Sequence, residues 1–346
     1  MASAQLAGRP APGPPPGAIA RPRRESTASW PLADRVCHAL CWATGIGLCL
    51  VAAAIVLYML VKGIAYLQPK LFVESPAPSL HQSQAGGFLD PIVGTFIVAA
   101  IGIAIAAPAG VGIATWLTEY ARPRWLARAV ESGIETLAGV PSIVLALFGL
   151  LLFARGFFAF LSASANNGSV SGRSFLAAGI MMGVLALPLV VGATREALAQ
   201  LPSRLREASY ALGKTPATTI RRVLLPSIRP GIASGVVLGM GRIIGDTAII
   251  VILLGSTLKN QGAGGAPLLS TLRGAGSTLT SYVYNNSPAG EGNAPQKAYA
   301  AAFVLLMVVL ALNALVTRLS RGSDQPFGGG WRMLLMGRLG EWPWGG

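Results

Sequence analysis

Long apolar stretches, separated by polar and often basic segments, dominate the amino-acid sequence. A bilayer core about 30 Å thick is crossed by roughly 20 helical residues. Six stretches are apolar and long enough to cross it, at about residues 38–61, 90–117, 135–157, 174–194, 231–255 and 299–317. The pattern therefore predicts an all-α integral membrane protein with six transmembrane helices.

The composition agrees with this prediction. Of the 346 residues, 53% are hydrophobic and only 12% are charged, whereas soluble domains carry about 25% charged residues. The three cysteines, Cys37, Cys41 and Cys49, all lie at or within the first apolar stretch. They predict neither a disulfide framework nor a zinc site, because no Cys/His cluster has the required spacing.

The positive charge is unevenly placed between alternate connecting segments. One set of segments carries 19 of the 27 Lys and Arg side chains, and the other set carries seven. Because cytoplasmic loops are enriched in Lys and Arg, the first set is predicted to be cytoplasmic. It contains both termini and the central segment at residues 195–230. Membrane topology accounts for the basic charge, so a lipid bilayer is expected around the chain and no nucleic-acid partner is expected.

The ends of the chain differ in composition from its middle. Residues 1–36 are rich in Pro and Arg and predict a disordered cytoplasmic tail. Residues 37–320 form the predicted six-span domain, and residues 321–346 a cytoplasmic C-terminal tail. The long outer segment at 256–298 contains a β-prone stretch at 279–284.

The central segment at 195–230 predicts two short amphipathic helices joined by a tight turn. Gly213 is placed to end the first helix in the left-handed conformation. Thr215 is expected to cap the second helix and Pro216 to be its first residue. This second helix is predicted to stop before Pro226.

Several functions are compatible with such a segment. A DNA-binding helix-turn-helix has a similar outline, but membrane spans adjoin this segment on both sides. The sequence Gly213-Lys214-Thr215 resembles the end of a P-loop, but Ala208 occupies the position of the first glycine and no strand precedes it. A passive loop on the membrane surface and a protein-docking element remain.

The spacing within this segment resembles the EAA loop of ABC-importer permeases. The matching residues are Glu207, Ala208 and Ser209, then Gly213, then Leu225-Pro226. Ser209 replaces the usual third small residue. In that family the loop forms a coupling helix that sits in a cleft of the ATP-hydrolysing subunit, so the resemblance implies that these six residues couple the chain to an ATPase.

Other stretches resemble the phosphate-specific ABC importer permeases over about residues 40 to 320. They lie at residues 88–95, 107–112, 117–120, 135–144 and 241–248. The stretch at 278–291 is closer to the PstA-type subunit than to its PstC-type partner. The family usually has Glu where this chain has Asp246.

The resemblance implies a type I ABC importer permease in the bacterial inner membrane that carries inorganic phosphate. It also implies three protein partners: a PstC-type permease subunit, a dimer of ATP-binding subunits and an external phosphate-binding protein. ATP and Mg would be used by the ATPase, and this chain would bind no cofactor or metal and catalyse no reaction.

The fifth predicted span contains Arg242 and Asp246, which would be neighbours one turn apart on a continuous helix. Charged side chains inside a membrane are expected to pair or to face water. Two alternatives follow: a neutralised pair that locks helices together, or a translocation pathway in which Arg242 meets the anion. Glycines at 231, 235, 239, 241 and 245 predict close helix packing along the same span.

Three alternative functions stay open from the sequence. The chain could be a permease for another oxyanion such as sulfate or molybdate, or it could be the PstC-type partner subunit. A membrane enzyme would need an interfacial cluster of catalytic side chains, and neither a nucleophile-base constellation nor paired catalytic carboxylates stand out.

Overall fold

The computed structural model describes residues 31–76, 86–154, 158–161, 172–255, 272–288, 290 and 294–321, which are helical with no strand among them. The chain divides into two compact units, Met1–Ile55 and Val56–Gly346. The division falls inside the first helix, α1 (Leu32–Gly63). The predicted tails lie almost entirely outside the described residues, and the predicted boundaries at 36 and 320 stay predictions.

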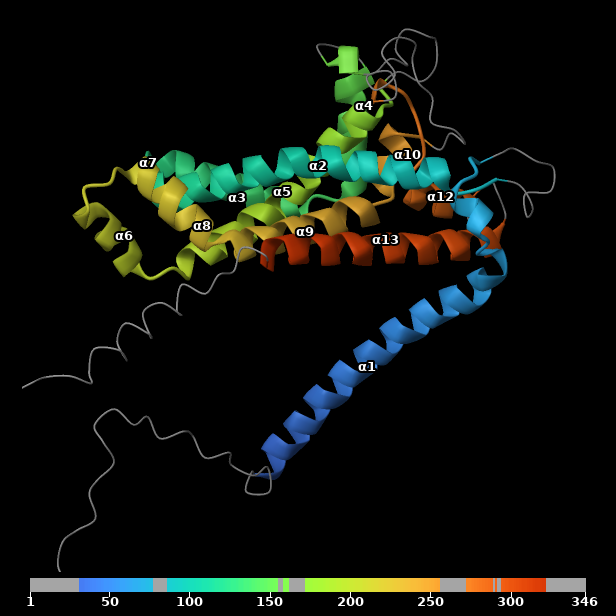
Figure 1. Ribbon diagram of the computed structural model, residues 1–346, viewed down its shortest axis with the longest axis horizontal. Helices are drawn as coiled ribbons and strands as arrows, with labels where there is room; N and C mark the ends of the chain where they lie inside the picture. The colour runs from blue at the N-terminus through green and yellow to red at the C-terminus, as the bar shows by residue number, and fades with distance from the viewer. Residues whose placement is uncertain are drawn as a thin grey trace, which may run out of the picture. The chain divides into compact units, whose positions relative to one another are not determined.

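Four long helices of the second unit lie side by side (Figure 1). They are α2 (Leu89–Thr115), α5 (Phe175–Ala199), α9 (Arg229–Gly245) and α13 (Pro295–Arg321). In the most apolar 18-residue window of α5, 61% of the residues are buried, against 28% for the span that contains α2 and 17% for α13. Helix α5 is therefore the centre of the bundle.

The predicted number of spans is compatible with the helices found. Four helices among the described residues are long and apolar enough to cross a membrane. Up to six spans result if two bent pairs each count as one, namely Arg124–Gly139 with Ser142–Ala154 and Pro216–Ser227 with Arg229–Gly245. The predicted spans at 38–61, 90–117, 174–194 and 299–317 are confirmed as single long helices. The other two predicted spans are interrupted.

The prediction of one continuous helix at 135–157 is wrong. The chain forms α3 (Arg124–Gly139) and α4 (Ser142–Ala154), which meet at an angle of 108°. Val140 takes an extended conformation with ψ of 129°, because the ring of Pro141 disfavours helical geometry in the preceding residue. Figure 1 shows α4 leaving the bundle at a steep angle.

The predicted span at 231–255 is also broken. Helix α9 ends at Gly245, Asp246 is extended with ψ of 129°, and a short helix α10 (Ala248–Leu253) follows. Residues 246–247 therefore interrupt the helix inside an apolar stretch. Discontinuous helices of this kind are tolerated where the freed backbone groups are satisfied by protein or water.

The glycines of α9 separate into two groups. A Cβ at Gly231, Gly235 or Gly239 would meet α5, and at Gly231 it would lie 2.3 Å from the Ala197 Cβ. By contrast, a Cβ at Gly241 or Gly245 would meet no atom within 4 Å. The predicted close packing is thus confirmed for the first three glycines, whose missing side chains let α9 approach α5.

The stretch at 279–284 that was predicted to favour β structure is helical instead. It forms α12 (Leu279–Asn286), whose first turn is held by a capping box between Thr278 and Ser281. The Thr95 hydroxyl of α2 accepts a further hydrogen bond from the Leu279 N–H at 3.0 Å. These hydroxyls satisfy the N–H groups that a helix start leaves unpaired, so tertiary contacts override the local preference. Burial raises the pKa of Tyr282 in this helix to about 12.

Candidate functional site

The central segment forms a helical hairpin at one end of the bundle, opposite α10 and α12 (Figure 1). Its first helix, α6 (Ser203–Ala211), begins after Pro202. Gly213 then has φ of +72°, and the Lys214 N–H donates to the Ser209 carbonyl at 3.2 Å. The predicted left-handed glycine turn is confirmed.

The second helix of the hairpin starts as predicted but ends later. Thr215 caps α7 (Pro216–Thr219) by accepting a hydrogen bond from the Thr218 N–H. A π-helical turn, η7 (Ile220–Leu224), and the short α8 (Leu225–Ser227) continue the helix through Pro226. The prediction that it stops before Pro226 is wrong. Pro226 directly follows the π-helical turn, whose last hydrogen bond is donated by the Leu225 N–H to the Ile220 carbonyl; the ring removes one further N–H without ending the helix.

The two arms of the hairpin are joined by a buried hydrogen bond. The hydroxyls of Ser209 and Thr219 lie 2.8 Å apart, and the two residues are only 4% and 0% exposed. Ser209 is the buried residue of α6, and Leu198, Ile220 and Leu224 from α5 and the second arm form part of a small apolar cluster. A small polar residue at 209 therefore both fits the turn and fastens α6 to α7.

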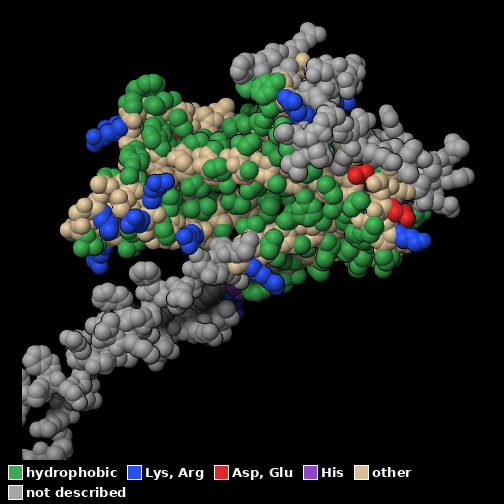
Figure 2. Space-filling view, turned by 45° about the horizontal axis from the view of Figure 1, so that its top comes forward, with side chains coloured by type: hydrophobic (Ala, Val, Ile, Leu, Met, Phe, Trp, Pro, Cys, Tyr) green, Lys and Arg blue, Asp and Glu red, His purple; other side chains and the backbone are tan. Residues whose placement is uncertain are grey.

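The opposite side of α6 is open and forms a candidate docking face. Glu207 and Ala208 are exposed, and Leu212 and Tyr210 are 77% and 46% exposed. Among the described residues, Glu207 makes no hydrogen bond or ion pair. We call this set, Glu207, Ala208, Tyr210 and Leu212, the docking face. Figure 2 shows Lys and Arg side chains gathered at this end of the bundle.

Leu225 and Pro226, the last two residues of the EAA-like spacing, lie elsewhere. Both are half-buried in α8, and Leu225 packs against the apolar cluster that contains Leu224. They are therefore placed where the hairpin joins the bundle, not on the docking face. At Ile228 the chain then bends by 69° into α9.

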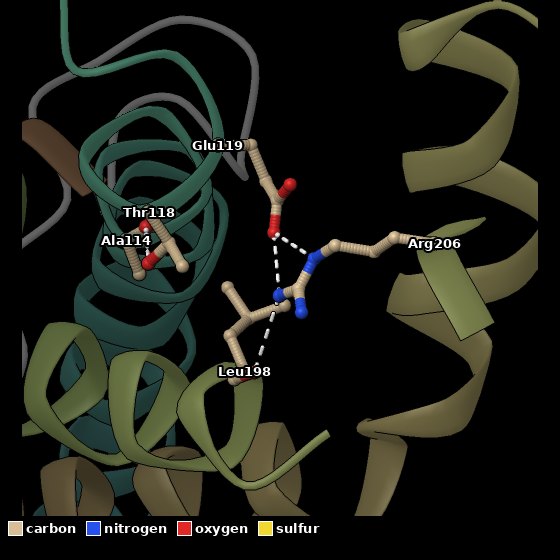
Figure 3. A network of polar contacts seen from close by, with 5 residues as sticks. All are labelled: Ala114, Thr118, Glu119, Leu198 and Arg206. Atoms are coloured by element: carbon tan, nitrogen blue, oxygen red, sulfur yellow. Dashed lines mark hydrogen bonds and ion pairs between the residues drawn. The ribbon is translucent and has the colours of Figure 1, made fainter. Parts of the chain in front are cut away.

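Arg206 points from α6 towards the end of α2. Its Nε and Nη2 donate to the same oxygen of Glu119, Oε1, at 3.1 and 2.8 Å, and Nη2 also donates to the Leu198 carbonyl at 3.4 Å (Figure 3). Glu119 lies in a π-helical turn, η4 (Trp116–Tyr120), that extends α2. The candidate docking helix is thus attached to α2 as well as to the helices that flank it in sequence.

A second ion pair lies nearby but does not involve the hairpin. Arg195 of α5 donates to Glu131 of α3 at 2.6 Å, with side chains 40% and 39% exposed. It ties the amphipathic helix α3 to α5. Arg195, the first residue of the predicted loop at 195–230, thus still belongs to the α5 span.

Arg242 and Asp246 do not form an ion pair. Asp246 is the residue at which the chain leaves the helix. The Asp246 carboxylate instead accepts a hydrogen bond from the Ile249 N–H at 3.1 Å, at the start of α10. Arg242 is exposed in the last turn of α9 and has no hydrogen bond or ion pair with the part of the chain that the structure describes.

Residues 106–325 match the family described as "Binding-protein-dependent transport system inner membrane component". The match covers more than half of the chain. The chain belongs to this family. It is therefore the membrane component of a transporter and not an enzyme. In general, permeases of ABC importers work with a partner permease, an ATPase and a binding protein.

Two relatives each match 68% of this chain. The phosphate transport system permease protein PstA 1 of Mycobacterium tuberculosis H37Rv is 33% identical over 236 residues, which cover 68% of this chain and 70% of that protein. The phosphate transport system permease protein PstC of Xylella fastidiosa 9a5c is 29% identical over 252 residues, covering 68% and 75%.

A solved structure shares the fold. A bacterial alginate ABC transporter, crystallised with an alginate-bound periplasmic protein, has a chain that superposes with a TM-score of 0.60. The identity is 15%, and the superposition covers 85% of this chain and 96% of that one. The expected fold, an all-α permease of the ABC-importer kind, is confirmed.

The sequence did not single out every residue on which the permease hairpin depends. Glu119 was noted only as part of the stretch at 117–120, and Arg206 and Thr219 were given no role. Their partners are 87 and 10 residues away in sequence. Two signals were available in the sequence: the carboxylate of Glu119 at the end of an apolar span, and Arg206 on a short helix that follows another span.

Proposed function

We propose that this chain is a membrane-spanning permease subunit of an ATP-driven importer of inorganic phosphate. The transport role rests on the family and on the exposed docking face of α6. The cargo rests on the relatives, two of which are named as phosphate transport permeases at 29% and 33% identity. Arg242, exposed beside a break in a span, supplies the positive charge that an anion path needs.

The partners proposed for this subunit are those of such an importer. A second permease subunit of the PstC type would complete the pathway, and an external binding protein would deliver phosphate. Two ATP-binding subunits would dock at the cytoplasmic hairpins. ATP and Mg would be bound by those subunits, and this chain would hold no cofactor.

Docking is proposed to use the exposed face of α6, with Glu207 meeting a basic group of the ATPase. A Glu207→Lys variant should fold normally, since Glu207 has no partner among the described residues, but it should capture much less ATPase in a pull-down. Glu196→Lys is the matched control, because Glu196 is an exposed carboxylate on α5 away from the docking face. Equal capture by the two variants would remove Glu207 from the docking site.

The cargo is tested by uptake of labelled oxyanions in cells that lack the chromosomal gene. Expression of this chain with its partner subunits should restore phosphate uptake and leave sulfate and molybdate uptake unchanged. Arg242→Ala should abolish uptake because it removes the positive charge from the path. Arg242→Lys should retain part of the uptake because it keeps that charge. Restoration of sulfate or molybdate uptake alone would replace phosphate as the cargo.

The proposed orientation places both termini and the hairpin in the cytoplasm of a bacterial cell. In a variant without Cys37, Cys41 and Cys49, a single cysteine can be introduced at the exposed Ser203 in α6 or at the exposed Lys70. A membrane-impermeant maleimide should label position 70 in intact cells and position 203 only after lysis. The reverse pattern would invert the topology.

A further inference from the structure

The stretch Leu117–Tyr120 has a structural role that transport by itself does not explain. It forms most of the π-helical turn η4 at the end of α2. Within this turn the Thr118 hydroxyl donates back to the Ala114 carbonyl at 2.8 Å. The Glu119 side chain is only 9% exposed, which is unusual for a carboxylate at the end of a helix.

The carboxylate is enclosed because Arg206 covers it. Two nitrogens of the guanidinium donate to Glu119 Oε1, and the Arg206 side chain is 23% exposed. The same guanidinium reaches the Leu198 carbonyl in the last turn of α5 at 3.4 Å, where the Leu201 N–H also donates. Figure 3 shows Arg206 reaching from α6 to both elements.

We propose that Arg206 and Glu119 are positioning residues that transmit movement of the docking helix α6 to α2. This inference rests on the proposed function, in which an ATPase pulls on α6. The ion pair gives α6 a connection to a span that lies 87 residues earlier in the sequence. Movement at the hairpin would then reach α2 directly and not only through the neighbouring helices in the chain.

The packing of the bundle explains why α2 is the useful target. Helices α2 and α5 pack closely because side chains of each helix lie against glycines of the other. A Cβ at Gly179 would lie 2.5 Å from Ile101, and one at Gly110 would lie 2.7 Å from Val190. Such close contacts make α2 and α5 move together. Helix α6 is joined to α7 by Ser209 and to the ends of α2 and α5 by Arg206, so a pull on α6 displaces several helices at once.

An ion pair can link two helices in this way only if it is shielded from solvent. An exposed ion pair contributes little because water and salt screen it, whereas breaking an enclosed pair leaves an uncompensated charge. The Arg206–Glu119 pair is enclosed, with side chains 23% and 9% exposed, whereas the Arg195–Glu131 pair is 40% and 39% exposed. The second pair ties α5 to α3 and does not touch α6, so it is a matched control.

The test measures oxyanion imported per ATP hydrolysed by the full complex in proteoliposomes. The variants are Arg206→Glu, Glu119→Arg and the double exchange, each compared with the same changes at Arg195 and Glu131. Each single change at 206 or 119 should lower the transport ratio at least about tenfold, because it leaves an enclosed charge facing a like charge. Capture of the ATPase should stay near wild type, since the docking face is intact.

The double exchange should restore much of the ratio, and the milder Glu119→Gln and Arg206→Lys variants should fall between. These milder variants also keep the test valid if a charge reversal prevents assembly. A merely structural role predicts lower yield or melting temperature with an unchanged ratio in the assembled complex. That result, or equal losses in the Arg195 and Glu131 variants, would overturn the proposal.

Failure of the proposed cargo is distinguishable from failure of this inference. If the wild-type complex imports another oxyanion, the same ratio is measured with that oxyanion, and the comparison between the two ion pairs stands. If the wild-type complex hydrolyses ATP without importing any of the three oxyanions, the proposed importer function fails. Stimulation of ATP hydrolysis by the binding protein then replaces the ratio, and an unchanged stimulation in the Arg206 and Glu119 variants would overturn the link.

Discussion

The Ser209 and Thr219 hydroxyls share a hydrogen bond of 2.8 Å between the two arms of the helical hairpin. Both residues are buried, so neither hydroxyl can exchange this partner for bulk water. Helix α6 is therefore joined to α7 by a polar contact that is shielded from water.

Removing one of these hydroxyls should destabilise the hairpin. Ser209→Ala leaves the Thr219 hydroxyl buried without this partner, at a cost of about 1–3 kcal/mol. Adding Thr219→Val should cost less than the sum of the two single changes, because the orphaned group is removed too. Thermal unfolding of the purified complex checks this, and fully additive losses would show that the two hydroxyls act independently.

Gly213 should be sensitive to backbone strain and not to crowding. Its φ is +72°, and a Cβ there would meet no atom within 4 Å. Gly213→Val should therefore cost about 1–2 kcal/mol through the left-handed conformation alone and should reduce ATPase capture by misplacing α6. Gly213→Asn is the control, since Asn tolerates this conformation. Capture that is equally reduced in both variants would point to the side chain and not to the strain.

The glycines of α9 should respond to alanine according to the neighbour that each one faces. Gly231→Ala forces a Cβ to within 2.3 Å of the Ala197 Cβ, and overpacking of this kind costs about 1–3 kcal/mol. Gly241→Ala meets open space and should be neutral or slightly stabilising. Thermal unfolding of the two variants compares them directly, and similar melting temperatures would contradict the close approach of α9 to α5.

Asp246 should show separable effects of capping and charge. Asp246→Asn keeps an oxygen that can accept the Ile249 N–H, so the start of α10 should be retained while the negative charge is lost. Asp246→Ala loses the cap as well, at a cost of about 1 kcal/mol. Thermal unfolding should therefore distinguish Ala from Asn. Oxyanion uptake should change in both variants if the charge restrains the anion, and in Ala alone if only the cap is needed.

The hairpin was the part of the site most open to prediction from sequence. Gly213 has no Cβ to resist the left-handed turn, and Thr215-Pro216 carries a cap and a fixed φ, so local chemistry specifies the turn. The end of the second helix was misjudged because Pro226 was treated as a stop. Whether a proline ends a helix depends on which backbone hydrogen bond its missing N–H removes. The π-helical turn before Pro226 changes which N–H and carbonyl groups are paired there, and the local sequence does not reveal that turn.

The charged pair in the fifth span shows the limit of the same approach. The sequence predicted one continuous helix through Arg242 and Asp246. The helix instead ends at Gly245, and the Asp246 carboxylate accepts a hydrogen bond from the next helix. The residues on both sides of the break are hydrophobic, so the apolar pattern predicted one span despite the polar Asp246 and Thr247 at the break itself. Likewise, the 108° bend between α3 and α4 has a local cause in Pro141, but its direction depends on what the helices pack against.

Hydrophobicity and charge along the sequence were sufficient to determine a helical membrane protein, because a bilayer accepts few structures other than long apolar helices. The spacing around Glu207 and Gly213 was sufficient to mark the hairpin. Only the tertiary structure decided that Arg206 reaches Glu119, that Ser209 reaches Thr219, and that Arg242 stands apart from Asp246. These relations join residues through contacts between helices, and helix packing is set by the shapes of all the neighbours together and not by the local sequence.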